Sequence, residues 1–306
     1  MGSPVPSVDE RARRRLRARF GNEIDPWLEE LPALLAALGE RWGLEFGPLI
    51  PQGSMSVVIR CDTADGRSAV LKVAPDRARL GMEADALATW ATPHVPVVHA
   101  VDAGVGALLM EAIEPGGMLR DASRYPAMES VAELLTSLHS HGSAGAAFPP
   151  LTHRIAYLFD SWAGQRQLHP ELVELVPEDL FARGRAYAAR LAAQRSPTAL
   201  LHGDLTPVNV LDGGERRGLV AIDPAPCLGD PAYDAIDLLV WQAGDVATIE
   251  ARAARLATAI DADVARLIDW CLAFASMFAL DLWGAGDNWR DRAAPLLSLA
   301  SQVPRS

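Results

Sequence analysis

Residues 201–211 have the sequence Leu-His-Gly-Asp-Leu-Thr-Pro-Val-Asn-Val-Leu, and this segment is the most informative about the fold of the chain. Apolar residues frame the stretch, and between them Asp204 and Asn209 lie five residues apart on a predicted loop. Such a pair suits phosphoryl transfer, in which the Asp accepts or orients a hydroxyl proton and the Asn amide oxygen binds Mg²⁺. Asp223 ends the strand-like run 220–223, fourteen residues after Asn209, and is where a second metal ligand is expected.

The residues after Asn209 predict a hairpin. The turn chemistry of Asp212-Gly213-Gly214 would return the chain so that Asp223 lies beside Asn209. Each of these residues is ambiguous by itself, because a loop Asp or Asn is usually a cap or turn residue and a strand-end Asp is often only solvated. Their combination, with a lysine on a predicted strand about 130 residues upstream, favours a phosphotransfer site.

That lysine, Lys72, stands out by composition. Of the 28 basic residues, 27 are arginine and Lys72 is the only lysine. A chain so biased keeps a lysine where a compact, flexible ammonium is required, although chance survival of one lysine is the alternative. The local sequence favours the first interpretation, because residues 69–73 are a predicted strand and the next predicted helix, 81–90, carries Glu83.

The pattern along the chain predicts an α+β fold with two lobes. After a helical start up to about residue 42, short apolar runs separated by turns predict a small sheet, with strands over 49–51, 56–61, 69–73, 95–98 and 106–113. Pro115-Gly116-Gly117 marks a break, which divides the chain into a nucleotide-binding lobe, 1–114, and a larger helical catalytic lobe, 115–306. Expected helices of the second lobe cover 128–139, 153–166, 177–195, 234–242 and 263–282.

Three motifs together resemble the aminoglycoside phosphotransferase family of the protein-kinase-like fold. They are His-Gly-Asp-Leu at 202–205 with Asn209, Ile-Asp-Pro at 222–224, and Gly-Asp-Pro-Ala-Tyr-Asp at 229–234. The second and third motifs are most similar to the branch that holds streptomycin 6-kinases and hydroxyurea phosphotransferases. The resemblance runs from the glycine turn near Gly53 to the region of Trp283, and it implies the bilobal kinase architecture.

By this resemblance, Asp204 would be the catalytic base, and Asn209 and Asp223 would bind Mg²⁺. Asp230, Asp234 and Asp237 are expected to hold the catalytic loop through hydrogen bonds to its backbone, in preference to contacting the substrate; they follow the Ile-Asp-Pro triplet.

The resemblance also implies the nucleotide contacts. Lys72 would bind the α- and β-phosphates of ATP or GTP, and Glu83 would pair with Lys72 and aim it. A solvated helix face is the competing interpretation of Glu83, and Asp85 is a weaker rival for the pairing. A loop covering the phosphates and a hinge whose backbone meets the purine edge would supply the rest, from Gly53, Ser54, Ser56, Glu111 and Ile113.

Two absences narrow the class of kinase. The chain has no GxxxxGK[ST] motif, which excludes a P-loop enzyme. The segment from Asp223 to Gly229 is short, and Gly203 stands where a protein kinase has an arginine before its catalytic Asp, so a protein substrate is disfavoured. Many relatives carry a histidine where this chain has Thr206, which affects substrate identity more than chemistry.

Substrate recognition is expected in the late part of the helical lobe. Asp281, Trp283 and Asp287 combine carboxylates with an aromatic ring near a loop, a mixture that suits an amine- or guanidine-bearing polyol. A packed helix end with capping aspartates is the alternative. A net charge of −11 argues against nucleic acid as partner and suits a cationic ligand or a metal ion, although acidic surface also simply maintains solubility.

The sequence also gives an expectation for the cellular location of the protein. The longest apolar run is too short for a membrane span, and the N-terminal arginines are not followed by the apolar core of a secretory signal. Three widely spaced cysteines indicate a reduced, cytoplasmic setting. We therefore expect a cytoplasmic, monomeric O-phosphotransferase of an aminoglycoside such as streptomycin. The alternatives are a kinase of another metabolite (hydroxyurea, a sugar or an amino alcohol) and a non-catalytic kinase-like binding module.

Overall fold

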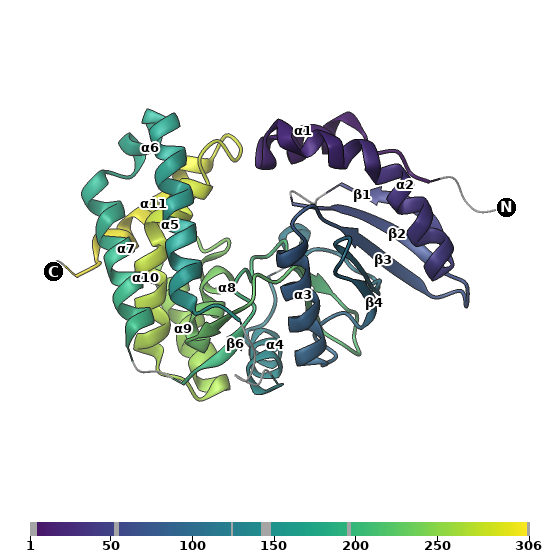
Figure 1. Ribbon diagram of the computed structural model, residues 1–306. Helices are drawn as coiled ribbons and strands as arrows, with labels where there is room; N and C mark the ends of the chain where they lie inside the picture. Colours follow the sequence, from purple (N-terminus) through teal and green to yellow (C-terminus); the bar gives the residue numbers. More distant parts are fainter. Residues whose placement is uncertain (1–4, 52–54, 124, 142–147, 195–196, 305–306) are drawn as a thin grey trace. The chain divides into compact units, whose positions relative to one another are not determined.

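The computed structural model describes residues 5–51, 55–123, 125–141, 148–194 and 197–304. The chain divides into two compact units, Met1–Gly116 and Gly117–Ser306 (Figure 1). The first unit is built on a β-sheet and the second is mostly helical, so the α+β prediction is confirmed.

The first unit contains one antiparallel sheet of five strands in the order β1-β2-β3-β5-β4. Its strands are β1 Leu44–Ile50, β2 Val57–Thr63, β3 Ser68–Val73, β4 Val98–Asp102 and β5 Ala107–Glu111. The strand expected at 95–98 was placed too early. Pro93 and Pro96 lack the amide donors that a strand needs, so these residues form a turn and β4 begins at Val98.

The two faces of this sheet pack against different helices. Side chains alternate along a strand, so Leu71 of β3 faces the apolar core formed with α1 (Glu10–Phe20) and α2 (Asp25–Trp42), together with Ala69, Val73, Leu31 and Leu35. Lys72 consequently points to the other face. There α3 (Arg77–Trp90) packs, and it presents the buried Glu83. Figure 1 shows α2 and α3 flanking the sheet.

The second unit is organised around α10 (Val264–Asp281), the apolar helix expected at 263–282. Helices α7 (Glu178–Ala193), α9 (Val246–Ile260) and α11 (Trp289–Ser301) pack against it (Figure 1). The remaining helices are α4 (Met128–His141), α5 (Leu151–Leu168), α6 (Pro170–Leu175) and α8 (Ile236–Val240), with 3-10 turns η2 (Leu119–Asp121) and η3 (Pro231–Ala235).

Three helices of this unit were missed: the short α6, and the helices α9 and α11, because only two helical stretches were expected to close the chain. In α9 the buried stripe includes Ala253 and Ala257 beside Ile249 and Leu256, and alanine gives a weak apolar signal. In α11, Pro295 lies inside the helix and disguises it. The helix expected at 234–242 is shorter, since the chain first makes the 3-10 turn η3.

Two short strand pairs carry the loops that matter for function. Strand β6 (Ala199–Leu201) pairs with β9 (Cys227–Gly229), and β7 (Val210–Asp212) pairs with β8 (Leu219–Ala221). In the described part of the chain, no helix combines the length and apolar character needed to cross a bilayer.

Candidate active site

The loop after β6 has a conformation that requires glycine. Gly203 has φ +74°, and a Cβ added there would collide with the carbonyl oxygen of Ala225. The backbone of Ala225 is fixed in turn, because its amide donates to the carbonyl of His202 at 2.9 Å. The side chain of the next residue, Asp204, is therefore presented by a backbone with little freedom.

The buried carboxylate of Asp234 anchors this loop through its backbone amides. Asp234 accepts hydrogen bonds from the amides of His202 and Gly203, at 2.8 and 2.9 Å, and from Nε2 of His139 at 3.0 Å. Burial opposes ionisation of Asp234, but the hydrogen bond and charge of His139 and the Gly203 amide outweigh it, so its pKa lies below the ordinary value. Asp234 thus anchors the loop, as predicted.

The same prediction was wrong for Asp230 and Asp237. Asp230 caps η3 through the amide of Ala232 and accepts from Arg266 Nε at 2.6 Å and Trp270 Nε1 at 2.8 Å, which are not loop residues. In the described part of the chain the Asp237 carboxylate has no hydrogen-bond partner, and it faces a pocket instead.

Replacing Gly203 with alanine should unfold this loop. The change forces an L side chain into a left-handed backbone and against Ala225, at a cost of roughly 1–3 kcal/mol from strain alone. Urea unfolding should show a lower midpoint. Gly244→Ala is the matched control, because an added Cβ there meets nothing within 4 Å. Equal midpoints for the two variants would contradict the prediction.

Asp204 is held from two sides. Arg154 Nη2 donates to Asp204 Oδ1 at 2.8 Å, and Arg154 Nε donates to the Gly203 carbonyl at 2.8 Å. Asn209 Nδ2 donates to the Asp204 carbonyl at 2.9 Å and to its Oδ2 at 3.2 Å. The Asp204 side chain is 31% exposed, so its carboxylate remains accessible from the pocket.

The predicted hairpin is present. The Gly213 amide closes the turn on the carbonyl of Gly218, and the Ile222 amide donates to the Asn209 carbonyl at 2.9 Å. Asp223, at φ +56°, therefore follows directly after the residue paired with Asn209. Because the Asn209 amide nitrogen faces Asp204, its amide oxygen is directed away from that carboxylate.

In the first unit, Lys72 and Glu83 form a buried ion pair. Lys72 Nζ lies 2.8 and 2.6 Å from the two carboxylate oxygens of Glu83, and the side chains are 7% and 3% exposed. Asp85, the rival partner, is exposed on the same helix. Lys72 and Glu83 belong to one unit, and Asp204, Asn209 and Asp223 belong to the other.

The other residues predicted to contact the nucleotide differ in whether the structure describes them and in how far they are buried. Gly53 and Ser54 lie outside the described residues, whereas Ser56 is buried just before β2. The Glu111 amide donates to the Val97 carbonyl at 2.9 Å, so that amide is already engaged within its own unit. Ile113 is buried.

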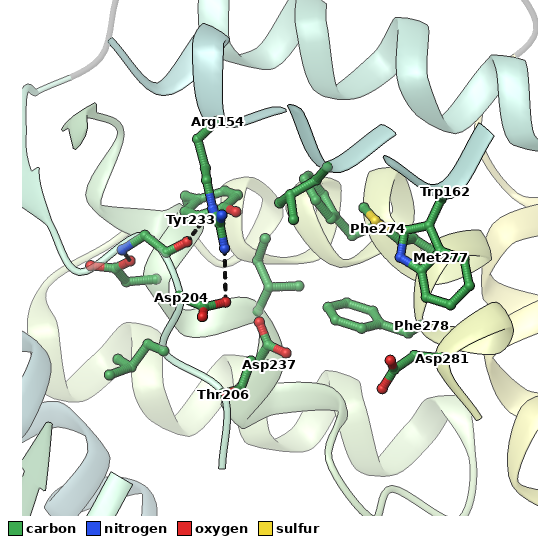
Figure 2. Close-up of a pocket in the computed structure, with 15 residues that line it drawn as sticks. Arg154, Trp162, Asp204, Thr206, Tyr233, Asp237, Phe274, Met277, Phe278 and Asp281 are labelled. Carbon is green, nitrogen blue, oxygen red and sulfur yellow. Dashed lines mark hydrogen bonds and ion pairs between the residues drawn. The ribbon is translucent and has the colours of Figure 1, made fainter. Parts of the chain in front are cut away.

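A pocket of about 170 Å³ opens beside Asp204, entirely within the second unit (Figure 2). Asp204, Asp237 and Asp281 provide carboxylates, and an aromatic wall with Trp162 and Phe278 lies opposite Arg154 in the view. The remaining lining residues are Leu158, Gly203, Leu205, Thr206, Tyr233, Asp234, Ile236, Phe274 and Met277.

The charges in this pocket act on one another. Burial, and then the negative charges of Asp204 and Asp281, raise the pKa of Asp237 to about 8, which the charge of Arg154 partly offsets. Partial desolvation and the charge of Asp204 likewise raise the pKa of Asp281, which still has an exposed surface, against the opposing charge of Arg292. A cation entering the pocket would relieve this mutual repulsion and lower the pKa of Asp237, so that this carboxyl ionises when the cation binds.

Of the three predicted substrate residues, the structure brings only Asp281 to this pocket. Trp283 is 37% exposed and packs against the ring of His169, 5.5 Å between ring centroids. Asp287 is exposed in the loop before α11 and does not line the pocket. Four pocket residues were not predicted as such from the sequence, and they come from three separate helices: Arg154, Trp162, Asp237 and Phe278.

Comparison with known proteins places this site in context. A family model described as "Aminoglycoside/hydroxyurea antibiotic resistance kinase" matches residues 41–285. The chain is 33% identical over 240 residues to a hydroxyurea phosphotransferase of Kitasatospora aureofaciens, covering 76% of this chain and 68% of that protein. It is 27% identical over 296 residues to a streptomycin 6-kinase of Streptomyces griseus, covering 93% of each.

Among solved structures, the choline kinase LicA from Streptococcus pneumoniae superposes with a TM-score of 0.59 at 14% identity, covering 89% of this chain and 99% of that one. The fold is therefore that of the protein-kinase-like phosphotransferases, and the expected architecture is confirmed.

Proposed function

Because this chain belongs to the aminoglycoside/hydroxyurea antibiotic resistance kinase family, and so is a small-molecule kinase, we propose that it phosphorylates a hydroxyl group of a cationic aminoglycoside such as streptomycin. The observation that supports this proposal most strongly is the pocket, whose lining combines the carboxylates of Asp204, Asp237 and Asp281 with aromatic side chains. Inactivation of an antibiotic would be the biological role.

The proposed chemistry is direct in-line transfer of the γ-phosphoryl group from ATP or GTP. The acceptor hydroxyl donates its hydrogen bond to Asp204, which orients the oxygen and takes the proton as the new P–O bond forms and the bond to the nucleoside diphosphate breaks. The two-sided hold on Asp204 supports this role, since a carboxylate fixed by Arg154 and Asn209 loses little freedom when the acceptor binds.

Asn209 and Asp223 are the proposed Mg²⁺ ligands. An amide oxygen and a carboxylate are hard oxygen donors, and Mg²⁺ usually takes one or two protein ligands together with substrate phosphates and water. The hairpin hydrogen bond between Asn209 and Ile222 supports their joint use. When bound, the ion would neutralise charge on the phosphates.

Lys72, aimed by Glu83, is proposed to hold the α- and β-phosphates, and the loop with Gly53, Ser54 and Ser56 to cover them. The purine edge is proposed to meet the backbone of Glu111 and Ile113. Since the Glu111 amide already donates to Val97, the other backbone groups of these two residues would make the contact.

The acceptor class follows from the charge of the pocket. Protonated amines and guanidinium groups pair with carboxylates and stack on aromatic faces. The Thr206 hydroxyl supports a polar acceptor as well. It lies in the pocket lining, its oxygen is buried, and among described residues it has no hydrogen-bond partner, so an acceptor group could satisfy it. Hydroxyurea carries no cationic group and would leave the negative charge of the pocket unpaired.

A panel of acceptors tests the proposal. Purified protein with Mg²⁺ and either labelled ATP or labelled GTP is offered streptomycin, other aminoglycosides, hydroxyurea, an amino alcohol and a neutral sugar. We expect transfer to an aminoglycoside, abolished in Asp204→Ala. Transfer to hydroxyurea or a sugar alone would overturn the aminoglycoside assignment. Magnesium-dependent nucleotide binding without transfer to any acceptor would indicate a binding module.

Asp237 gives the proposed acceptor site a pH dependence. Its folded-state pKa of about 8 lies above the ordinary value of 3.8, so the stability contributed by the protonated carboxyl is complete below the ordinary value and is lost as pH rises through about 8. Asp237→Asn cannot ionise. It should therefore melt at a higher temperature than the wild type at about pH 9 and at a similar temperature near pH 4.

The same substitution should weaken acceptor binding, with KM for a cationic acceptor rising roughly tenfold, about 1.4 kcal/mol. An unchanged KM together with an unchanged melting curve would contradict both statements. The charged and titratable groups that interact with Asp237 are Asp204, Asp281, Arg154, Asp234, Tyr125, Tyr233 and Cys271.

A further inference from the structure

Arg154 is the one basic side chain among the described residues that line the pocket, and it touches the proposed catalytic carboxylate directly. We propose that Arg154 is a positioning residue. By binding the Asp204 carboxylate, it keeps cationic groups of the acceptor away from Asp204, so that Asp204 binds the acceptor hydroxyl while Asp237 and Asp281 bind the cationic groups. This inference rests on the proposed function and adds to it a residue that determines how the acceptor is oriented.

The first support is the two-point contact. One edge of the guanidinium binds the Gly203 carbonyl through Nε and the Asp204 carboxylate through Nη2, both at 2.8 Å (Figure 2). The contact therefore fixes the backbone of the loop and the rotamer of the reacting side chain together. A lysine ammonium, which is a point charge, could not reproduce this fork.

The second support is the rigidity of the platform that carries Arg154. The residue lies in the first turn of α5, and the segment just before it pairs with β9, since the Leu228 amide donates to the Pro149 carbonyl at 2.9 Å. Leu151 also packs so closely on Gly229 that an added Cβ would lie 2.5 Å from its side chain. The Arg154 side chain is only 10% exposed, so it is held in place rather than solvated.

The third support is the charge of the surroundings. Asp204, Asp237 and Asp281 line a pocket of about 170 Å³, so an amine on the acceptor could pair with any of them. Pairing with Asp204 would place a cation where the hydroxyl must lie. Because Arg154 already occupies Oδ1 of Asp204 and Asn209 approaches Oδ2, the unpartnered Asp237 becomes the better site for a cation, and the hydroxyl is left to Asp204.

The test compares Arg154→Gln and Arg154→Lys with Arg185→Gln. Arg185 pairs with Asp160 on the exposed side of α5 at 2.6 Å, with 45% of its side chain exposed, and serves as the matched control. In Arg154→Gln we expect kcat to fall roughly 10–100-fold, because small displacements of reacting groups cost about this much, while KM for the nucleotide changes less than about threefold. Arg154→Lys should recover only part of the loss, and Arg185→Gln should behave as wild type.

Two readouts separate positioning from a merely structural role. First, a cationic acceptor should inhibit Arg154→Gln at high concentration, because its amine now competes for Asp204, and this substrate inhibition should be absent from the wild type. Second, adding Arg154→Gln to Asp204→Asn should lower the residual kcat less than about threefold, since a residue that acts through Asp204 has nothing left to position.

The outcomes are distinct. Failure of the wild type to phosphorylate any acceptor would remove the proposed function, and this inference with it. A wild type that is active, with an Arg154→Gln variant that is folded and retains kcat, would overturn the role of Arg154 alone. If Arg154→Gln does not fold, Arg154→Lys carries the same comparison, and independent multiplicative losses in the double variant would also overturn the inference.

Discussion

Replacing Asp204 with asparagine is expected to lower kcat by roughly 10²–10⁴-fold, the range that a positioned general base contributes. Asparagine keeps the shape of the side chain and can still accept a hydrogen bond from Arg154, but it cannot take the proton of the acceptor hydroxyl. Nucleotide affinity should change little, because the substitution leaves Lys72 and Glu83 untouched. Single-turnover transfer of labelled phosphate measures the chemical step directly.

Asp287→Asn is the matched control for this experiment. Asp287 was a predicted substrate residue, yet it is exposed before α11 and does not line the pocket. Its substitution should leave kcat and KM unchanged. A loss in Asp287→Asn comparable to that in Asp204→Asn, with both proteins folded by circular dichroism, would show that the pocket beside Asp204 is not where the acceptor reacts.

Breaking the ion pair between Lys72 and Glu83 is expected to cost about 3–5 kcal/mol of unfolding free energy, the usual consequence of leaving one buried charge without its partner. In Lys72→Met the Glu83 carboxylate, whose side chain is only 3% exposed, loses its ion pair with the ammonium group. Urea unfolding should show the loss. Arg67→Met is the control, because the ion pair of Arg67 with Asp65 lies in the solvent, and no shift of the midpoint is expected.

A double variant separates stability from function. Lys72→Met combined with Glu83→Leu replaces the pair by apolar groups of similar size, which is often neutral or stabilising. We expect most of the lost stability to return. Phosphate transfer should not return, because no ammonium remains for the nucleotide phosphates. Recovery of activity along with stability would refute the proposed role of Lys72.

The parts of the site that could be predicted from sequence are those that lie close together along the chain. Asp204, Asn209 and Asp223 are joined by one loop and one hairpin, so turn chemistry alone brings them together. Lys72 was identified for a different reason, because a chain that otherwise uses arginine retained one lysine, on a strand whose alternation turns it away from the apolar core.

The pocket could not be predicted in the same way. Arg154, Asp237 and Asp281 lie on α5, α8 and α10, and only the packing of those helices brings them together. Arg154 is one of 27 arginines and carried no local signal. Asp237 follows Asp230 and Asp234 in sequence and was grouped with them as a loop anchor, although its helix turns its carboxylate into the pocket. Local patterns report neighbours in sequence, and acceptor recognition depends on neighbours in space.

Because Lys72 is buried near the end of β3, its accessibility also measures how often this part of the sheet opens. A protease that cleaves only after lysine has a single target bond in the whole sequence, between Lys72 and Val73, and the strand pairing of β3 protects it. Digestion should therefore yield just two fragments, at a rate set by how often this sheet opens. Amine-reactive labels face the same barrier, so their incorporation at Lys72 would follow the opening of its pair with Glu83 without any engineered probe.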